Sequence, residues 1–404
     1  MTETTTTTGG GTTAGSIAVH EHGVPLAGPG TGRATPDARP QAVESRNPED
    51  FPAVGGREED WRFTPVKALK TLLDGSAEAD GDVAIAWDAP TGVTVERVGI
   101  DDPRIGKASL PADRAAAVAL TKSDGALVIT VAADTVTEKP IAISVKGSGG
   151  TAFGHLVIDV KPGARATVVL DHEGSGTFSA GIEAIVGDSA NLTLVSLQDW
   201  EDGSVHLGQH SFLVGRDAKL KAAHVSLGGA VVRIVPRVRY AGPGGDAELL
   251  GLYFADEKQH LEHRTLVDHQ VPQCRSRVTY KGALQGESAR TVWIGDVIIG
   301  AEAIGTDTYE LNRNLLLTDG ARADSVPNLE ILTGEVVGAG HASTTGRFDD
   351  EQLFYLQSRG IPEDDARRMV VRAFFAEVIG RIGIPDLQER LLAAIDVELE
   401  EASQ

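Results

Sequence analysis

The sequence predicts a mainly β protein whose core is a parallel β-helix, a solenoid of short strands. Short runs of β-branched and aliphatic residues recur from about residue 150 to residue 337, and no helical period persists for long there. Between these runs a turn pattern repeats, in which glycine or a small polar residue precedes an alanine that opens the next run. Corners repeated along a chain are typical of a solenoid. A two-sheet sandwich is the alternative, although one of more than about 200 residues would be unusual with so few aromatic residues.

The repeated turns lie at irregular intervals along the chain. They are Pro162–Ala164, Gly187–Ala190, Gly215–Ala218, Gly244–Ala247, Gly286–Ala289, Gly300–Ala303 and Asp319–Ala321. The β-helix core is expected to span residues 146–347.

The chain before the core divides into two parts. Residues 1–44 are rich in Thr, Gly and Pro, and this composition predicts a disordered tail. Residues 45–145 are expected to form a helical and mixed region, in which Trp61 and Phe63 attach the segment to a neighbouring surface. A helix is predicted to begin with Pro65 at its first position. The strands and short helix expected after it are 83–87, 93–98, 111–120 (the helix), 127–131 and 141–145.

Residues 348–404 are expected to form a C-terminal helical subdomain, because the hydrophobic period changes to 3.6 after His341. Asp349 is placed to cap a first helix, Pro362 to start a second, and Asp386 to cap a third. The apolar face expected on the second helix consists of Ala366, Met369, Val370, Ala373 and Phe374.

Composition excludes several classes of function. The net charge is −21, from 58 acidic and 37 basic residues, so nucleic acid and anionic membranes are not expected partners. Residues 1–15 lack a basic start followed by an apolar run, so no secretory signal is expected. No stretch approaches the roughly 20 apolar residues of a membrane span. The expected location is the cytoplasm.

His341 is the strongest candidate for a metal ligand. It lies in the segment Gly338-Ala-Gly-His-Ala-Ser343, where small neighbours leave space for a bulky group beside the imidazole. A neutral imidazole is a good ligand for iron. The alternative is a structural histidine in a tight turn, hydrogen-bonded to the backbone. The position of His341, between a β region and a helical tail, indicates a site at a subunit interface.

Other polar residues carry weaker signals. His260 and His263 resemble a metal-binding pair, but residues three apart on a strand point to opposite faces. Cys274 is the single cysteine and is expected to be buried or incidental. Acidic residues that could form a carboxylate pair for sugar chemistry are Asp199, Glu201, Asp202, Asp307 and Glu310, although solvated loop charges are the expected role.

Several motifs resemble the SufB/SufD family of iron–sulfur cluster assembly proteins. They are Arg57–Pro65, Gly305–Leu317, Pro327–Ile331, Gly340–Ala342, Leu353–Ile361 and Phe374–Phe375. Within the family the chain is similar to the SufD branch, because Asn312-Arg313-Asn314 stands where SufB-type chains have a cysteine. Many SufD sequences have Cys-Ser-His-Gly at the histidine turn. Here the turn reads Ala339-Gly340-His341-Ala342, so only the histidine is kept.

The resemblance implies a right-handed parallel β-helix in a non-catalytic scaffold subunit. It implies a complex with a SufB-like sister subunit and a SufC-like ATPase, which assembles iron–sulfur clusters and passes them to target proteins. A transient cluster would form at the SufB interface, with His341 as the ligand from this chain. The ATPase would dock at Phe354, Tyr355, Arg359 and Gly360. A bound flavin and a homodimer of the isolated chain are also compatible with the sequence, which decides neither.

Two other classes of function stay open from the residues alone. One is a carbohydrate-active β-helix enzyme, a lyase or hydrolase. Such enzymes are commonly secreted and bind sugars on aromatic platforms, and aromatic residues make up 5% of this chain. The other is a β-solenoid adaptor that holds no cluster.

Overall fold

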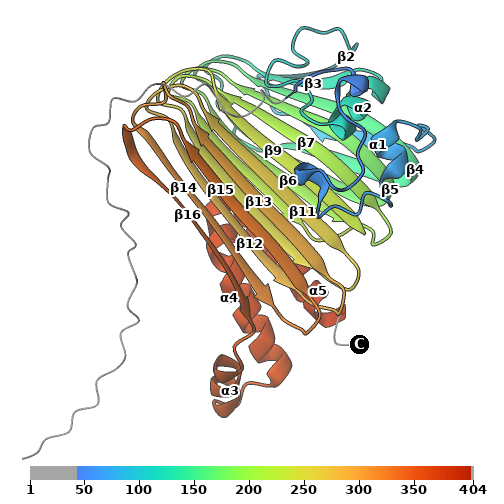
Figure 1. Ribbon diagram of the computed structural model, residues 1–404, viewed down its shortest axis with the longest axis vertical. Coiled ribbons are helices and arrows are strands. Elements are labelled where there is room, and N and C mark those ends of the chain that lie inside the picture. Colours follow the sequence, from blue (N-terminus) through green and yellow to red (C-terminus); the bar gives the residue numbers. More distant parts are fainter. Residues whose placement is uncertain (1–42, 402–404) are drawn as a thin grey trace, which may run out of the picture. The chain divides into compact units, whose positions relative to one another are not determined.

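The computed structural model describes residues 43–401 and contains a β-solenoid built from two sheets of parallel strands, as Figure 1 shows. The long strands β4 (Ile141–Val160) and β5 (Arg165–Val186) run through both sheets. One sheet continues with β6 (Asn191–Trp200), β8 (Lys219–Ser226), β10 (Asp246–Ala255), β12 (Arg275–Leu284), β14 (Thr306–Leu316) and β16 (Val336–Arg347). The other continues with β7 (Val205–Val214), β9 (Val231–Tyr240), β11 (His260–His269), β13 (Arg290–Ile299) and β15 (Arg322–Ile331). The predicted fold class is confirmed. The predicted tail, residues 1–44, lies outside the described residues except for Val43 and Glu44.

The corners of the solenoid carry the repeated turn pattern. The alanines that end it at positions 164, 190, 218, 247, 289 and 303 are almost fully buried, because a methyl group fits where one sheet bends into the next. Several corners need a left-handed backbone, which glycine adopts without strain at Gly163 and Gly244. Ser189 and Asp217 hold the same conformation without being glycine. The spacing of the turns therefore marks the corners of the coil.

The first strands of the described chain pair with the long strand β4 and its neighbour. β1 (Val83–Asp88) runs antiparallel to β4, and β2 (Val93–Val98) runs antiparallel to β3 (Ala126–Val131). β3 in turn runs parallel to β4. These strands and α2 (Arg114–Lys122) lie close to their predicted positions. The solenoid thus ends at its N-terminal side with antiparallel pairing.

The prediction that a helix begins at Pro65 is wrong in its starting residue. A tight turn occupies residues 65–69, with i to i+3 hydrogen bonds, and α1 spans only Lys70–Asp74. The hydroxyl of Thr64 does not cap the turn. It donates instead to a carboxylate oxygen of Glu262 on β11, 2.8 Å away. The side chain of Thr64 thus makes a tertiary contact with the solenoid rather than a local one.

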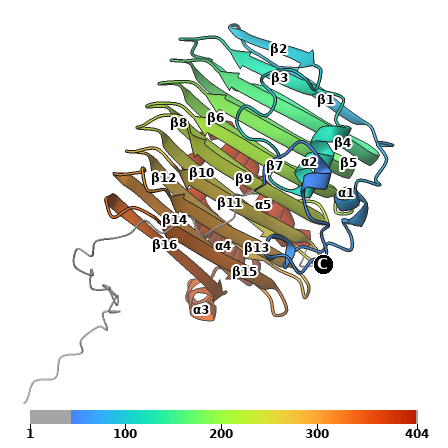
Figure 2. The ribbon, with the colours of Figure 1, turned by 45° about the horizontal axis from the view of Figure 1, so that its top comes forward.

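Three layers of apolar packing hold the described chain together. The solenoid interior is filled by aliphatic and aromatic side chains from both sheets. The N-terminal segment and α2 cover the outer face of the sheet that contains β7 and β9. The C-terminal helices cover the outer face of the other sheet, against β6, β8, β10 and β12 (Figure 2). Each sheet is therefore buried on both faces along much of its length, as is usual for parallel sheets.

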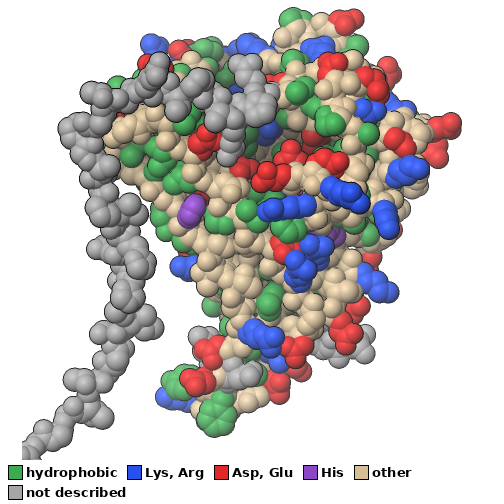
Figure 3. Space-filling model, in the orientation of Figure 1, with side chains coloured by type: hydrophobic (Ala, Val, Ile, Leu, Met, Phe, Trp, Pro, Cys, Tyr) green, Lys and Arg blue, Asp and Glu red, His purple; other side chains and the backbone are tan. Residues whose placement is uncertain are grey.

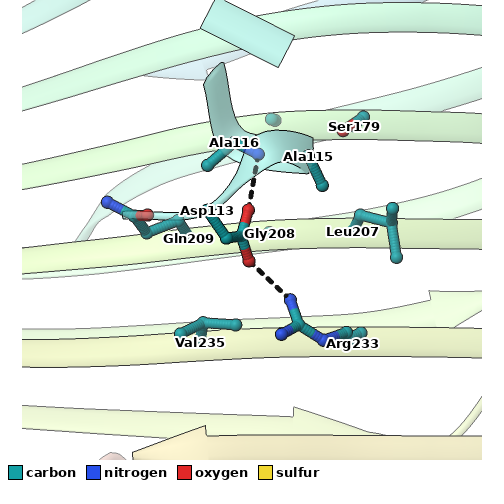
Figure 4. A pocket seen from close by; sticks show the side chains of 10 residues that line it. Asp113, Ala115, Ala116, Ser179, Leu207, Gly208, Gln209, Arg233 and Val235 are labelled. Carbon is teal, nitrogen blue, oxygen red and sulfur yellow. Dashed lines mark hydrogen bonds and ion pairs between the residues drawn. The ribbon is translucent and has the colours of Figure 1, made fainter. Parts of the chain in front are cut away.

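A buried arginine fixes the N-terminal segment to the solenoid (Figure 4). Arg233 on β9 donates to Asp113 over 2.9 Å and to Glu262 over 3.2 Å, and its guanidinium lies 4.0 Å from the ring centre of Trp61. Asp113 also accepts from the backbone N–H of Ala116 and so caps α2. Burial alone would raise the pKa of Glu262, but its hydrogen bond with His260 and the charge of Arg233 lower that pKa to about 2. Trp61 attaches the segment as predicted.

The C-terminal region contains α3 (Asp350–Ser358), α4 (Glu363–Ile382) and α5 (Pro385–Glu401). Asp349 accepts from the backbone N–H of Glu351 and caps α3 as predicted. The apolar face predicted for α4 is wrong in part: Ala366 is buried, but Met369 is 49% exposed and Ala373 is also exposed. The residues of α4 that are buried are Ala366, Val371, Phe375, Val378, Ile379 and Ile382. No helix among residues 43–401 is long and apolar enough to cross a membrane.

Candidate functional site

The C-terminal end of the solenoid is open. β15 pairs only with β13, and β16 pairs only with β14, so within the described chain the outer edge of each strand has no partner strand. Strands this long present a row of free backbone N–H and C=O groups. Side chains that point into the solenoid from this last coil have no further coil above them. The end of the solenoid is therefore both a template for strand pairing and the mouth of its interior.

His341 lies on the interior side of β16. Its register partner on β14 is Glu310, which is 1% exposed and points inward. The neighbouring Gly340 instead faces the ring of Tyr309, a side chain on the outer face. Because side chains alternate along a strand, the imidazole of His341 shares the inner face with Glu310. The ring is nevertheless exposed, since no coil covers it.

The interior is polar in the layer beneath His341. β14 contributes the buried polar side chains Thr306, Thr308, Glu310, Asn312 and Asn314. Asn314 donates to Asn312 over 2.8 Å, to Ser325 over 2.9 Å and to Thr345 over 3.3 Å. This network joins β14 to both strands of the last coil. The interior near the open end thus contains a connected layer of hydrogen-bonded polar side chains.

Glu310 stands apart from this network. Neither of its carboxyl oxygens has a hydrogen-bond partner among the described residues. The carboxyl group reaches across the interior to β13, where a Cβ built on Gly295 would lie 2.9 Å from one of its oxygens. The indole N–H of Trp293, beside the same glycine, is also unpartnered. Burial raises the pKa of Glu310 to about 8, and the charge of Asp296 adds to that shift.

The other histidine candidates lie elsewhere in the coil. His260 and His263 are on β11, where His260 pairs with Glu262 and His263 pairs with Ser226. The two rings therefore face opposite sides of the strand, as predicted. His269 lies further along β11, 2.9 Å from the hydroxyl of Ser276. Within the described chain, no three of its His, Cys, Asp and Glu side chains gather closely enough to hold a metal ion by themselves.

Cys274 is buried at the corner before β12, and burial raises the pKa of its thiol. The expected burial is confirmed. A buried thiol that is held protonated is a poor nucleophile and a poor ligand. Cys274 is therefore a poor candidate for a cluster ligand.

The carboxylates do not form the pair that sugar hydrolysis would need. Asp199 on β6 lies 3.5 Å from Arg390 of α5, and Asp307 on β14 lies 2.6 Å from Arg277. Four strand spacings separate these strands, which is roughly 19 Å. Asp307 and Glu310 are close in sequence but lie on opposite faces of β14. Glu201 and Asp202 are exposed at a corner.

The residues predicted to bind a partner lie on α3 and the turn after it. Phe354 is 72% exposed and Tyr355 is 57% exposed. The guanidinium of Arg359 lies 5.2 Å from the ring centre of Tyr355, and one of its nitrogens donates to the phenol oxygen over 3.1 Å. Gly360 has a positive φ of 85°, which ends the helix and turns the chain towards α4. Figure 3 shows hydrophobic side chains exposed at the end of the molecule where Figure 1 places α3.

Comparison with known proteins identifies the family. Residues 143–374 match the SUF system FeS cluster assembly, SufBD core domain. The chain belongs to the SufBD family of iron–sulfur cluster assembly proteins. This SufBD family chain is 55% identical over 358 residues to an iron–sulfur cluster assembly SufBD family protein of Mycobacterium tuberculosis, covering 87% of this chain and 90% of that protein. It is 31% identical over 257 residues to the iron–sulfur cluster assembly protein SufD of Escherichia coli, covering 62% and 59%. The SufD of Bacillus subtilis is 26% identical over 283 residues, covering 68% and 64%.

The family membership confirms the resemblance that the motifs carried, and it gives the chain a role in iron–sulfur cluster assembly. The matched core begins in β4 and ends within α4, so it includes the open end and His341. Sequence reasoning selected His341 as a candidate ligand from its small neighbours, and that role stays a prediction. It named Glu310 only as one of several scattered carboxylates, because the register between β14 and β16 cannot be read from the sequence.

Proposed function

We propose that this chain is the SufD-like scaffold subunit of a complex with a SufB-like sister subunit and a SufC-like ATPase. The observation that carries the proposal is the position of His341, on the interior face of the last coil and beside two unpaired strand edges. A sister solenoid that pairs with these edges would enclose the imidazole at the junction. The complex would assemble clusters there and pass them to target proteins.

The cluster is the cargo of this site, and its remaining ligands come from the partner. The chain has one cysteine, Cys274, which is buried at the corner before β12. Iron–sulfur clusters are held mainly by cysteine thiolates, so this chain cannot supply a full set. An imidazole from His341 is suited to one iron position. Under this proposal each subunit supplies only part of the ligand set, and this chain acts as a scaffold rather than as an enzyme.

Replacement of His341 by alanine tests the proposal. Because the ring is exposed at the end of the solenoid, we expect the free energy of unfolding of the isolated chain to change by less than about 1 kcal/mol. Iron and sulfide bound per assembled complex should fall at least tenfold. Melting temperature and metal content are measured together. Thr344→Ala, on the opposite face of β16, and Cys274→Ser serve as controls and should leave the metal content unchanged.

A purely structural histidine would give the opposite result. Loss of backbone hydrogen bonds would then destabilise the chain by about 1–3 kcal/mol, with normal cluster loading per folded complex. Normal iron and sulfide in the His341→Ala complex would end the proposal that this residue is a ligand.

A further inference from the structure

The carboxyl group of Glu310 has no structural role that its surroundings explain. It is almost fully buried, yet neither oxygen has a hydrogen-bond partner among the described residues. An unpartnered buried carboxyl group destabilises a fold, whereas a leucine or methionine at this position would fill the interior without that cost. The neighbouring asparagines of β14 do form a connected network. Glu310 is therefore positioned for something that the isolated chain does not contain.

The register places this carboxyl group next to His341. Glu310 and His341 are Cα partners on adjacent strands, and both side chains lie on the interior face. Adjacent strands lie about 4.8 Å apart, so side chains stacked in register can both reach one ion that is bound between them. Only the last coil separates Glu310 from the open end. A rotation of its side chain from Gly295 towards β16 would bring an oxygen under the imidazole.

We propose that Glu310 and His341 together form a two-ligand site for ferrous iron at the mouth of the solenoid. This inference rests on the proposed function, since it adds a second ligand to the same cluster assembly site. Imidazole nitrogen and carboxylate oxygen are a donor set that suits divalent iron. Two protein ligands leave the other coordination positions to sulfide, to water or to thiolates of the partner. With Glu310 as a second ligand, this chain can bind iron before a thiolate from the sister subunit is present.

The test is cobalt binding by the full isolated chain, because Co²⁺ accepts the same donors and its visible absorption reports on its ligands. Wild-type protein is titrated with Co²⁺ beside Glu310→Gln, Glu310→Asp and His341→Ala. We expect Glu310→Gln and His341→Ala each to weaken binding at least tenfold and to change the visible spectrum. Glu310→Asp keeps a shorter carboxylate and should show an intermediate affinity. Asp307→Asn, an outward-facing acid on the same strand, is the matched control and should bind Co²⁺ as the wild type does.

The outcomes separate this inference from the proposed function. Unchanged affinity and spectrum in Glu310→Gln would overturn the role of Glu310, even if His341→Ala still lost its cluster in the complex. Equal weakening by Asp307→Asn would likewise overturn it, since the binding would then be a general effect of surface charge. Glutamine keeps the size of the side chain, so Glu310→Gln is expected to melt at the wild-type temperature at pH 7. If Glu310→Gln melts at a lower temperature, the Co²⁺ affinity and spectrum of Glu310→Asp decide the role of Glu310 instead.

Discussion

Six histidines are buried among the aromatic and aliphatic side chains of the solenoid interior. They are His172, His206, His210, His224, His263 and His269. The rings of His172 and His206 lie 4.8 Å apart, and those of His210 and His224 lie 5.1 Å apart. Desolvation lowers the pKa of every one of them, to about 4 for His172 and about 3 for His263. The interior therefore holds these rings neutral at pH 7.

Neutral burial makes the fold sensitive to mild acid. A histidine whose folded pKa is lowered stabilises the fold above its unfolded pKa of about 6.5, and that stability is lost as the pH falls towards the folded value. For His172 the window runs from about pH 6.5 to about pH 4. The expected loss from this residue between pH 8 and pH 5 is on the order of 2 kcal/mol.

His172→Phe isolates this effect. Phenylalanine keeps a ring among Phe178, Trp200 and His206, but it loses the 2.8 Å hydrogen bond from Nδ1 to the carbonyl oxygen of Leu197. We expect the variant to be less stable than wild type at pH 8, by about 1 kcal/mol. At pH 5 the difference should shrink or reverse. Denaturant unfolding at both values measures it, and a constant difference would show that His172 does not titrate in this window.

The polar layer at β14 is a case in which the inner face of a strand cannot be predicted from the sequence. In the segment Thr306–Asn314 the even positions are polar and buried, whereas Tyr309 is 43% exposed. Alternation of hydrophobic residues would place Tyr309 and Leu311 inside. The true inner face follows from hydrogen bonds to other coils, such as that from Asn312 to Tyr253, 59 positions away. Local pattern and structure disagree here because these inner polar side chains are satisfied by hydrogen bonds to other coils, which alternation along a single strand does not reveal.

At the scale of elements, strands were predicted more accurately than helix faces. β1, β2 and β3 follow from short runs of β-branched and aliphatic residues and from the Gly, Asp and Pro residues that bound them. The buried face of α4 was misplaced because its apolar residues continue around the helix, so Met369 and Val371 were equally suitable from the sequence. Which of these residues is buried depends on how α4 docks on the sheet. Arg381 of α4 donates to Glu248 of β10 over 2.7 Å, and Lys281 of β12 donates to the carbonyl oxygen of Phe374 over 2.8 Å.

The helix α3 carries the aromatic residues that we predict to bind an ATPase partner. Its Phe354 and Tyr355 are exposed, and aromatic anchors often carry much of the energy of an interface. We expect the double variant Phe354→Ala/Tyr355→Ala to lose at least 30-fold in affinity for the SufC-like subunit, at unchanged melting temperature. Titration calorimetry with that subunit measures the loss. Val397→Ala on α5, also exposed, is the control.

Wild-type affinity in the double variant would place the ATPase contact elsewhere. Point variants are sharper than deletion of the C-terminal region, because α4 and α5 bury apolar residues of the sheet such as Leu250 and Phe254. Deletion after Gly346 would expose that surface, so a loss of binding could then arise from misfolding.

At the scale of the whole molecule, the open end distinguishes this solenoid from a closed one. β16 carries no charged residue from Val336 to Gly346, and such an uncharged edge is unusual unless another strand covers it. Pro327 in β15 fits the same interpretation. The N–H groups of Arg322 and Leu332 donate to β13 and its end, so by alternation the odd positions of β15 point to the free edge. A proline at position 327 therefore removes no hydrogen bond to β13.

The same geometry allows the sister contact to be tested without unfolding the chain. The N–H of Phe348 donates to the carbonyl oxygen of Leu316, so the N–H of Ala342 faces β14 and that of Ser343 faces the free edge. Ser343→Pro should keep the melting temperature of the isolated chain within a few degrees, since edge strands tolerate proline there. If the sister solenoid pairs along β16, co-purification with the SufB-like subunit should fall sharply. Ala342→Pro breaks the ladder to β14 and should lower the melting temperature clearly. Undiminished co-purification of Ser343→Pro would exclude strand pairing along β16 and leave the contact to side chains alone.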